Sequence, residues 1–265
     1  MPVSDEAASP RHVPTSTQEI FGPRVHKYAL VIPVINEGDR IRQQLMRINA
    51  AHFPIDVIVA DGGSKDGSLA RDFVTSAGVR AVLIKTGPGK LSAQLRMAYA
   101  WCLDEGYAGI VTVDGNGKDD IRAIPAFLQK LDEGYDYVQG SRYLPGGQAI
   151  NTPLDRKIAG RLIHAPAMSL AGRHWFTDTT NGFRAYSASY LGDPRVAPFR
   201  DVFMTYELLF YLTARAGQTG HRVIEIPVTR QYPKGEKTPT KISGVAGRLD
   251  MLREIYGVLS GRFNP

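Results

Sequence analysis

Residues 111–120 read V-T-V-D-G-N-G-K-D-D, so three residues typical of a strand lead directly into a flexible and highly polar segment. An ordinary strand-to-helix turn needs one glycine and one acidic cap, and Asp119 can supply the cap. Asp114 and Asn116 exceed that local need. Their carboxylate and amide oxygens at one strand end are candidates for binding a ligand, and the rest of the chain must indicate which ligand.

Strand-like and helix-like segments alternate between residues 28 and 140. The expected strands are 28–34, 55–61, 79–85, 108–114 and 135–141. The expected helices between them are 37–51, 66–78, 90–106 and 119–134. Strands of continuous Val, Ile and Leu that are separated by helices predict a parallel sheet covered on both faces. Right-handed crossovers make this a doubly wound α/β fold with a mostly parallel sheet.

Ligands of such a sheet bind outside the carboxyl ends of its strands. Polar and glycine residues follow these ends at 36–37, 61–62, 86–90 and 114–116. Capping of the next helix explains any one of these positions, because Asp, Asn and Glu are favoured in a first helical turn. Several strand ends of this kind favour a binding site over capping alone.

Two common phosphate-binding motifs are absent from the sequence. The segment V-I-N-E-G at 34–38 does not contain the G-x-G-x-x-G of dinucleotide-binding domains, and no segment reads G-x-x-x-x-G-K-[ST]. The segment G-P-G-K at 87–90 places Lys90 at the start of an expected helix. It fits a backbone cradle for a phosphate and a plain turn equally well.

The composition limits the classes of protein that the chain can form. Its 265 residues, 43% of them apolar, can build one large domain or one domain with a small appendage. Residues 1–24 mix Pro, Ser, Thr and charges without periodicity, which predicts a flexible leader. The net charge of +6 suits an anionic partner. Nucleic acid is not expected, because the sequence does not place aromatic residues among the basic ones.

The cellular location is predicted from two further features. The sequence contains neither a run of eighteen apolar residues nor the apolar segment of a secretory signal. Its one cysteine, Cys102, is expected to be buried in a reducing compartment. We therefore expect a cytoplasmic protein, with a peripheral position on the cytoplasmic face of a membrane as the alternative.

Six segments resemble the family 2 glycosyltransferases, and among them the polyprenyl-phosphate branch that includes dolichol-phosphate mannose synthases. The first three, VIPVINEGDRI, VIVADGGSKDGS and VTVDGNGKDD, resemble V-I-P-x-x-N-E, V-V-D-x-G-S-x-D-G-T and the D-x-D metal motif. The others, GSRYLPGG, DTTNGFRAYSASYL and TYELLFYLTARAGQTGHRVIEIPVT, resemble G-S-R-Y, D-x-T-S-G-F-R-A and a long helix-strand pattern ending in E-V-P-I. Each motif alone is weak, but six in the correct order over about residues 28–230 are specific.

The resemblance implies a fold, a domain organisation and a reaction. It implies a GT-A (nucleotide-diphospho-sugar transferase) catalytic domain over 25–243, followed by a packing helix at 244–265. The implied reaction is the transfer of a sugar, with inversion, from a nucleotide sugar to polyprenyl phosphate. Two alternatives are a family 2 enzyme with a hydroxyl acceptor and a nucleotidyltransferase, although I-N-E-G-D-R after the first strand suits the latter poorly.

The resemblance also implies a divalent cation, Mg²⁺ or Mn²⁺, that offsets the charge of the leaving diphosphate. Asp114 is the implied principal ligand. Asn116 stands where the family usually has a second Asp, and its neutral amide is expected to weaken metal binding or leave the metal mainly to the diphosphate. Gly115 allows the backbone to pass close to the ribose and phosphates.

Other donor-side roles follow from the same resemblance. Pro33, Asn36 and Glu37 are implied to border the nucleotide. Asp61, next to Gly62, is implied to accept hydrogen bonds from the base or ribose.

Two acidic residues are candidates for the chemistry itself. Asp178 begins a tight polar loop that can hold a sugar hydroxyl, or that forms an Asx-turn. Glu207 lies on an otherwise apolar helix, where an unpaired carboxylate is costly. We expect Glu207 to pair with an arginine or to face the acceptor.

The acceptor side is basic. Arg142 and Arg156 match family arginines that face the lipid phosphate. The helix expected at 153–165 is two-faced: the basic residues are Arg156, Lys157, Arg161 and His164, and the apolar ones are Leu154, Ile158, Leu162 and Ile163. Pro166 is expected to kink or end it. Such a helix suits an anionic membrane surface or a core with one solvated face, and the resemblance favours the membrane.

A phosphate acceptor also affects the expected chemistry, because it is already ionised at neutral pH. The site then needs positioning and charge neutralisation and no general base. A hydroxyl acceptor would need a base, for which Asp201 and Glu207 are placed. Two segments near the chain end complete the prediction. Arg230 and a basic run at 232–241 are expected to add positive charge on a loop. A helical stripe is expected to pack on the core or on a second subunit, and it is made of Val245, Leu249, Leu252, Tyr256 and Leu259.

Overall fold

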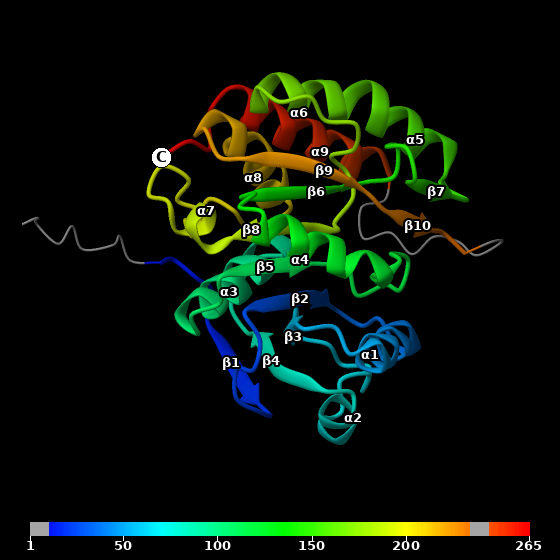
Figure 1. Ribbon diagram of the computed structural model, residues 1–265. Helices are drawn as coiled ribbons and strands as arrows, with labels where there is room; N and C mark the ends of the chain where they lie inside the picture. Colours follow the sequence, from blue (N-terminus) through cyan, green and yellow to red (C-terminus); the bar gives the residue numbers. More distant parts are fainter. Residues whose placement is uncertain (1–10, 234–243) are drawn as a thin grey trace, which may run out of the picture.

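A central eight-stranded sheet with helices on both faces forms the body of the molecule (Figure 1). The computed structural model describes residues 11–233 and 244–265, with side chains over 11–233 and 252–265. In spatial order the strands are β1 (Ser16–Ile20), β4 (Val79–Lys85), β3 (Asp56–Asp61), β2 (Tyr28–Val34), β5 (Gly109–Thr112), β8 (Arg184–Ser187), β6 (Tyr137–Ser141) and β9 (Val223–Pro227). A second, two-stranded sheet pairs β7 (Gln148–Ile150) with β10 (Thr229–Gln231).

The sheet is mostly parallel, as the sequence predicts. Strands β4, β3, β2 and β5 are parallel neighbours, and β6 pairs in parallel with β9. The five predicted strands are confirmed as β2 to β6. Strand β8 lies antiparallel between β5 and β6, so the carboxyl ends of β5 and β6 flank the chain that leads into β8.

Helices cover both faces because strand side chains alternate between two apolar cores. Ala29 and Val31 of β2 face one core, and Leu30 and Ile32 face the other. The helices are α1 (Asp39–Ala51), α2 (Arg71–Ser76), α3 (Leu91–Asp104), η1 (Ile121–Ala123), α4 (Ile124–Asp132), α5 (Leu154–Ala159), η2 (Gly160–His164), α6 (Ala165–Gly172), α7 (Ala188–Gly192), α8 (Glu207–Gln218) and α9 (Gly244–Leu259). The first core packs against α3, α6, α8 and α9, and the second against α1, α2 and α4.

The flexible leader predicted over residues 1–24 is wrong for part of that range. Residues 1–10 lie outside the described residues, but Ser16–Ile20 form β1, which pairs antiparallel with β4 at the edge of the sheet. Side chains secure this strand: Trp101 donates to Gln18 at 2.7 Å, and Arg71 pairs with Glu19 at 2.8 Å. The segment is polar because it is an exposed edge strand.

Helices α5, η2 and α6 form one continuous helical segment, so Pro166 does not end the helix as expected. A π-helical turn, η2, immediately precedes the α6 turn that contains Pro166, where the missing proline N–H is accommodated. His164 is buried against Phe210 and does not belong to the basic face predicted for this helix. The residues of the predicted apolar face are exposed, which excludes the alternative in which that face packs on the core.

Helix α9 packs against α6 and α8, but not through the predicted stripe. Leu252, Tyr256 and Leu259 are exposed, whereas Ile255 and Val258 are buried. Phe263 folds back beneath the helix and contacts Phe203, so the buried face is rotated from the one expected. The side chains of Val245 and Leu249 lie outside those described.

Arg184 is a buried charge that joins β8 to two other elements. It is 1% exposed and donates to the backbone carbonyls of Thr179 at 2.7 Å, Asn181 at 2.8 Å and Leu209 at 2.6 Å. A further bond at 3.0 Å reaches Thr213 of α8. Arg184 therefore fixes the polar loop before β8 against helix α8.

We expect Arg184→Met to lower the free energy of unfolding by about 3 kcal/mol or more, because several buried carbonyls lose their donors. Urea denaturation followed by circular dichroism measures this change. Arg195→Met is the matched control: it removes an exposed arginine paired with Asp193 and should cost less than about 1 kcal/mol. Equal effects of the two substitutions would contradict the structural role of Arg184.

Candidate active site

Asp114 lies at the carboxyl edge of the sheet, immediately after β5. The Val113 amide still donates to the Val31 carbonyl at 3.2 Å, so the loop leaves beside the end of β2. Gly115 passes so close to β2 that a Cβ there would lie 2.9 Å from the Pro33 carbonyl oxygen. Pro33 therefore shapes the site with its backbone, and Gly115 is required for close approach.

Gln44 of α1 holds the Asp114 loop in place. Its Nε2 donates to the Asp114 carbonyl at 3.0 Å, and its Oε1 accepts from the Gly117 amide at 2.8 Å. Gln44 is 1% exposed. Sequence reasoning missed this residue, although a glutamine among the apolar positions of an amphipathic helix is a usable signal.

Arg230 connects Asp114 to a second, fully buried carboxylate. Its Nη2 lies 2.8 Å from Asp114 Oδ2, and its Nη1 pairs with Asp119 Oδ2. Burial alone would raise the pKa of Asp114, but Arg230 outweighs it and holds that pKa below its usual value. The second oxygen of Asp119, Oδ1, is buried and has no hydrogen-bond partner among the residues that the structure describes.

The residues around Asp114 can hold a divalent cation only with help from a ligand. Among the described residues, no three His, Cys, Asp or Glu side chains converge as a metal-binding group. Gly182 lacks a side chain and so leaves space beside Asp114. A Cβ at position 182 would lie only 2.5 Å from Asp114 Oδ1 and would fill that space. Asn116 lies next to it, with Nδ2 at 3.4 Å from Asp114 Oδ2. One carboxylate and one amide fit a cation that takes its other ligands from a diphosphate and water.

Three cations surround the ring of Tyr232 next to this acidic pair. Lys118 Nζ, Arg230 Cζ and Arg156 Cζ lie 5.1, 5.7 and 6.0 Å from the ring centroid. Burial and the nearby Arg230 lower the pKa of Lys118. Because basic groups gather here from the β5 loop, α5 and β10, the arrangement favours an anionic ligand.

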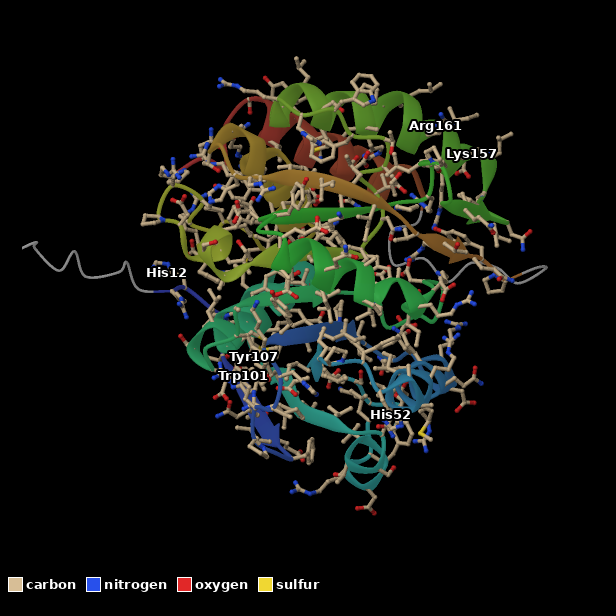
Figure 2. The ribbon with its side chains drawn as sticks, in the orientation of Figure 1. His12, His52, Trp101, Tyr107, Lys157 and Arg161 are labelled. Carbon is tan, nitrogen blue, oxygen red and sulfur yellow. The ribbon has the colours of Figure 1, made fainter. Side chains whose placement is uncertain are left out.

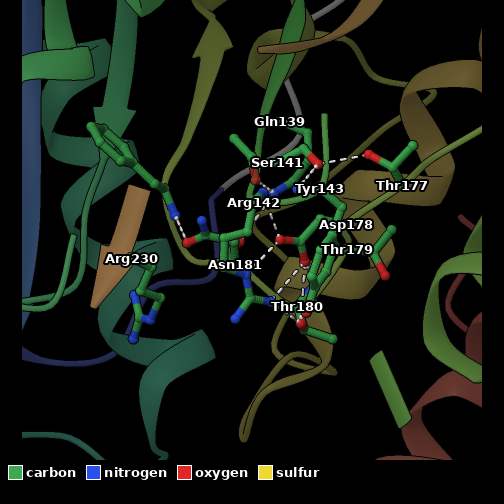
Figure 3. A network of polar contacts seen from close by, with 12 residues as sticks. Gln139, Ser141, Arg142, Tyr143, Thr177, Asp178, Thr179, Thr180, Asn181 and Arg230 are labelled. Carbon is green, nitrogen blue, oxygen red and sulfur yellow. Dashed lines mark hydrogen bonds and ion pairs between the residues drawn. The ribbon is translucent and has the colours of Figure 1, made fainter. Parts of the chain in front are cut away.

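Arg142 and Asp178 face each other (Figure 3). Arg142 Nε lies 2.6 Å from Asp178 Oδ2, Nη2 lies 2.9 Å from Oδ1, and both residues are buried. The two charges neutralise each other in this structure, and the sugar-binding role of Asp178 and the phosphate-facing role of Arg142 stay predictions. The pair fixes the end of β6 to the loop before β8.

Glu225 of β9 supports this loop from behind. It accepts from the Thr177 amide at 2.8 Å and from the Asp178 amide at 3.0 Å. Burial raises the pKa of Glu225 despite these hydrogen bonds. The signal for Glu225 in the sequence is an acidic residue within the apolar strand V-I-E-I-P, for which the sequence alone predicts no role.

Hydrogen bonds join the loops that follow β2 and β3, on the predicted donor side. Asp61 is 4% exposed and accepts from the Ser64 amide at 2.9 Å and from Ser64 Oγ at 2.7 Å. Asn36 has a positive φ of 50°; its side-chain oxygen accepts from the Lys65 amide at 2.8 Å, and its backbone amide donates to Ser64 Oγ at 2.9 Å. Asp61 therefore caps its own loop in this structure, and its contact with a base or ribose stays a prediction. Gly62 packs against Ile35 and Gln94.

The remaining predicted residues lie on the same edge. Glu37 is partly buried and lies 3.7 Å from Arg40. Lys90 is exposed at the start of α3, where its amide donates to the Met204 carbonyl at 2.7 Å. Glu207 accepts from the Thr205 amide at 2.7 Å and from its hydroxyl at 2.5 Å, so these hydrogen bonds come from a threonine and not from the expected arginine. The alternative, that Glu207 faces the acceptor, stays a prediction.

Asp114, Asn116, Lys118, Arg156 and Arg230 thus converge in one polar site at the sheet edge. Arg230 was predicted only as a loop charge, and Lys118 and Tyr232 were not assigned. The basic run predicted at 232–241 lies outside the described residues from position 234 onward.

The sequence and fold define the class of protein. Residues 29–193 match the family described as glycosyl transferase family 2. The chain therefore belongs to this family.

Individual proteins that resemble this chain over most of its length are more specific than the family. The chain is 28% identical to polyprenol monophosphomannose synthase of Mycolicibacterium smegmatis, over 89% of this chain and 88% of that protein. It is 29% identical to undecaprenyl-phosphate mannosyltransferase of Micrococcus luteus, over 81% and 86% of the two chains. The fold resembles that of glucosyl-3-phosphoglycerate synthase from Mycobacterium tuberculosis, solved with Mn²⁺, uridine diphosphate and phosphoglyceric acid. That match has a TM-score of 0.61 and 15% identity, over 89% of this chain and 78% of that one. It supports the GT-A assignment.

We expect Gly182→Ala to reduce glycosyltransferase turnover by about 100-fold, because the new Cβ displaces the Asp114 carboxylate and small displacements at a reacting centre are costly. Turnover is measured with a nucleotide-sugar donor in steady state. Gly192→Ala is the control, since a Cβ at Gly192 meets nothing within 4 Å. Normal turnover of Gly182→Ala would contradict a role for the observed position of Asp114.

Proposed function

We propose that this protein transfers a sugar, with inversion, from a nucleotide sugar to the phosphate of a polyprenyl phosphate. The observation that carries the proposal is the similarity, over more than four-fifths of the chain, to two relatives whose names specify mannose transfer to a polyprenyl or undecaprenyl phosphate. The cationic surroundings of Asp114 support it.

The charges of the site suit a phosphate acceptor. A phosphate nucleophile is ionised at neutral pH and needs orientation and charge neutralisation, without a general base. Lys118, Arg156 and Arg230 supply positive charge next to Asp114. The Glu207 carboxylate, one of the two candidate bases for a hydroxyl acceptor, accepts two hydrogen bonds from Thr205.

We further propose that Mg²⁺ or Mn²⁺ assists the donor half of the reaction. Asp114 and Asn116 would hold it, and the cation would offset the negative charge of the leaving diphosphate. The Mn²⁺ and uridine diphosphate bound to the mycobacterial synthase of the same fold support this proposal. Pro33, Asn36 and Glu37 would border the nucleotide, and the Asn36–Ser64–Asp61 hydrogen bonds would keep that border rigid.

The acceptor implies a membrane surface, and α5, η2 and α6 provide a suitable face. The apolar side chains exposed there are Leu154 (70%), Ile158 (49%), Leu162 (72%), Ile163 (48%) and Leu170 (78%), with Trp175 (75%) just after α6. Lys157 and Arg161 project from the same helical segment (Figure 2), and Arg173 ends it. A basic and apolar face of this kind fits an anionic lipid surface. No helix among the described residues is long and apolar enough to cross a bilayer.

The reaction is tested with purified protein, GDP-, UDP-, CDP- and dTDP-linked sugars, and undecaprenyl phosphate in detergent. We expect labelled sugar to enter the lipid fraction with one donor class, and Asp114→Ala to lower this transfer at least 100-fold because cation binding is lost (about the size of a 2.7 kcal/mol effect). Undecaprenol, which has the lipid but no phosphate, is the matched acceptor control. Equal transfer to undecaprenol would favour a hydroxyl acceptor and contradict the proposal.

Membrane contact is tested by sedimentation with vesicles. We expect the protein to sediment with vesicles containing phosphatidylglycerol and much less with pure phosphatidylcholine, because Lys157 and Arg161 meet anionic headgroups. Leu162→Glu should weaken this binding by about tenfold, since one buried leucine contributes roughly 1.5–3 kcal/mol. Val25→Glu, at an exposed valine outside this face, is the control. Unchanged binding of Leu162→Glu would rule out this face.

A further inference from the structure

Arg230 lies on Oδ2, one of the two carboxylate oxygens with which Asp114 would bind a cation. Its Nη2 lies 2.8 Å from Asp114 Oδ2, and a guanidinium and a divalent cation cannot share one carboxylate oxygen without strong repulsion. We propose that Arg230 and the divalent cation compete for Asp114, so that Arg230 is the counter-ion of Asp114 whenever no cation is bound to it. The inference rests on the proposed use of a metal.

Asp119 allows Arg230 to move off Asp114 without leaving the Arg230 guanidinium unpaired. Arg230 Nη1 pairs with Asp119 Oδ2, and the Asp119 side chain is completely buried. The backbone is fixed as well, because the Asp120 amide donates to the Thr229 carbonyl at 3.0 Å and the Gln231 amide to the Lys118 carbonyl at 2.8 Å. Arg230 can therefore keep Nη1 on Asp119 while Nη2 leaves Asp114.

The released Nη2 has an anionic partner available when substrate is bound. Arg230, Lys118 and Arg156 all lie around the ring of Tyr232, and both arginines are close enough to its hydroxyl to lower its pKa despite burial. A phosphate oxygen brought into this cluster replaces Asp114 as the acceptor of the Nη2 hydrogen bond. The cation would bind the Asp114 carboxylate, and the phosphate would accept the hydrogen bond of the displaced Arg230 Nη2. Binding of either ligand would therefore favour binding of the other.

Charge balance explains why such a counter-ion is needed here. With Asn116 in place of a second acid, the site holds the carboxylates of Asp114 and Asp119 against Arg230 and Lys118. Without Arg230, two neighbouring carboxylates would face each other with one of them fully buried, which is costly. The arginine therefore stabilises the two carboxylates whenever no cation is bound and lowers the metal affinity of the site.

The experiment measures Mn²⁺ binding to donor-free protein from the electron paramagnetic resonance signal of free Mn²⁺. We expect Asp119→Asn/Arg230→Gln, made as a double variant, to bind Mn²⁺ at least about tenfold more tightly than the wild type, the scale of one charge-assisted hydrogen bond. The double variant removes one charge of each sign. Its net charge is unchanged, so a gain reports the lost Arg230–Asp114 contact and not general electrostatics.

Three further variants make the outcome decisive. Lys118→Gln removes a nearby positive charge that does not pair with Asp114 and should raise Mn²⁺ affinity less than the double variant. Adding Asp114→Asn to the double variant should abolish the gain. Arg230→Gln alone should also bind Mn²⁺ more tightly, and thermal unfolding shows whether Asp119 left alone destabilises it.

Unchanged Mn²⁺ affinity in the folded double variant, or a gain no larger than that of Lys118→Gln, would overturn the competition between Arg230 and the cation. Sugar transfer by the wild type, measured in parallel, separates this from a failure of the proposed function. Transfer that requires Mn²⁺, together with unchanged binding in the double variant, contradicts only the role of Arg230. A wild type that neither binds Mn²⁺ nor transfers sugar contradicts both.

Discussion

The buried ion pair between Arg230 and Asp119 is the interaction on which the site depends. Asp119 follows the loop after β5, and Arg230 lies on β10, in the small sheet beside the main one. Because Asp119 has no exposure to water, its charge is tolerable only with this partner. The pair fixes the distance between the Asp114 loop and the cations around Tyr232, and so places opposite charges at the two sides of one site.

Much of the fold follows from the apolar strands. Val, Ile and Leu continue through β2, β3 and β4 because both faces are covered, and this pattern made a parallel sheet readable in the sequence. Strand β1 was missed because S-T-Q-E-I is polar and lies at an exposed edge, where pairing with β4 rather than burial stabilises it. Helix α9 was oriented wrongly because a periodic stripe does not show which side the neighbouring elements cover.

The site was predictable where position in the fold determines it. Asp114 and Gly115 follow directly from the end of β5, and their neighbours β2 and α1 were readable. The pairing of Arg142 with Asp178 was not readable, because it depends on the close approach of the β6 end and the loop before β8, 36 residues apart. The contact of Arg230 with Asp114 spans 116 residues and has no local signal at all.

Arg156 connects the polar site around Asp114 to the exposed apolar face of α5, η2 and α6, so that both can contact one ligand. It lies on α5, the helix that exposes Leu154 and Ile158, and its guanidinium is 6.0 Å from the ring of Tyr232. An amphipathic lipid phosphate has the same order of parts, with a charged head at one end of an apolar chain. A head group held near Arg156 would therefore leave its chain beside the exposed face of α5. A soluble phosphate would have no use for that face, which is why the geometry favours a lipid-linked acceptor.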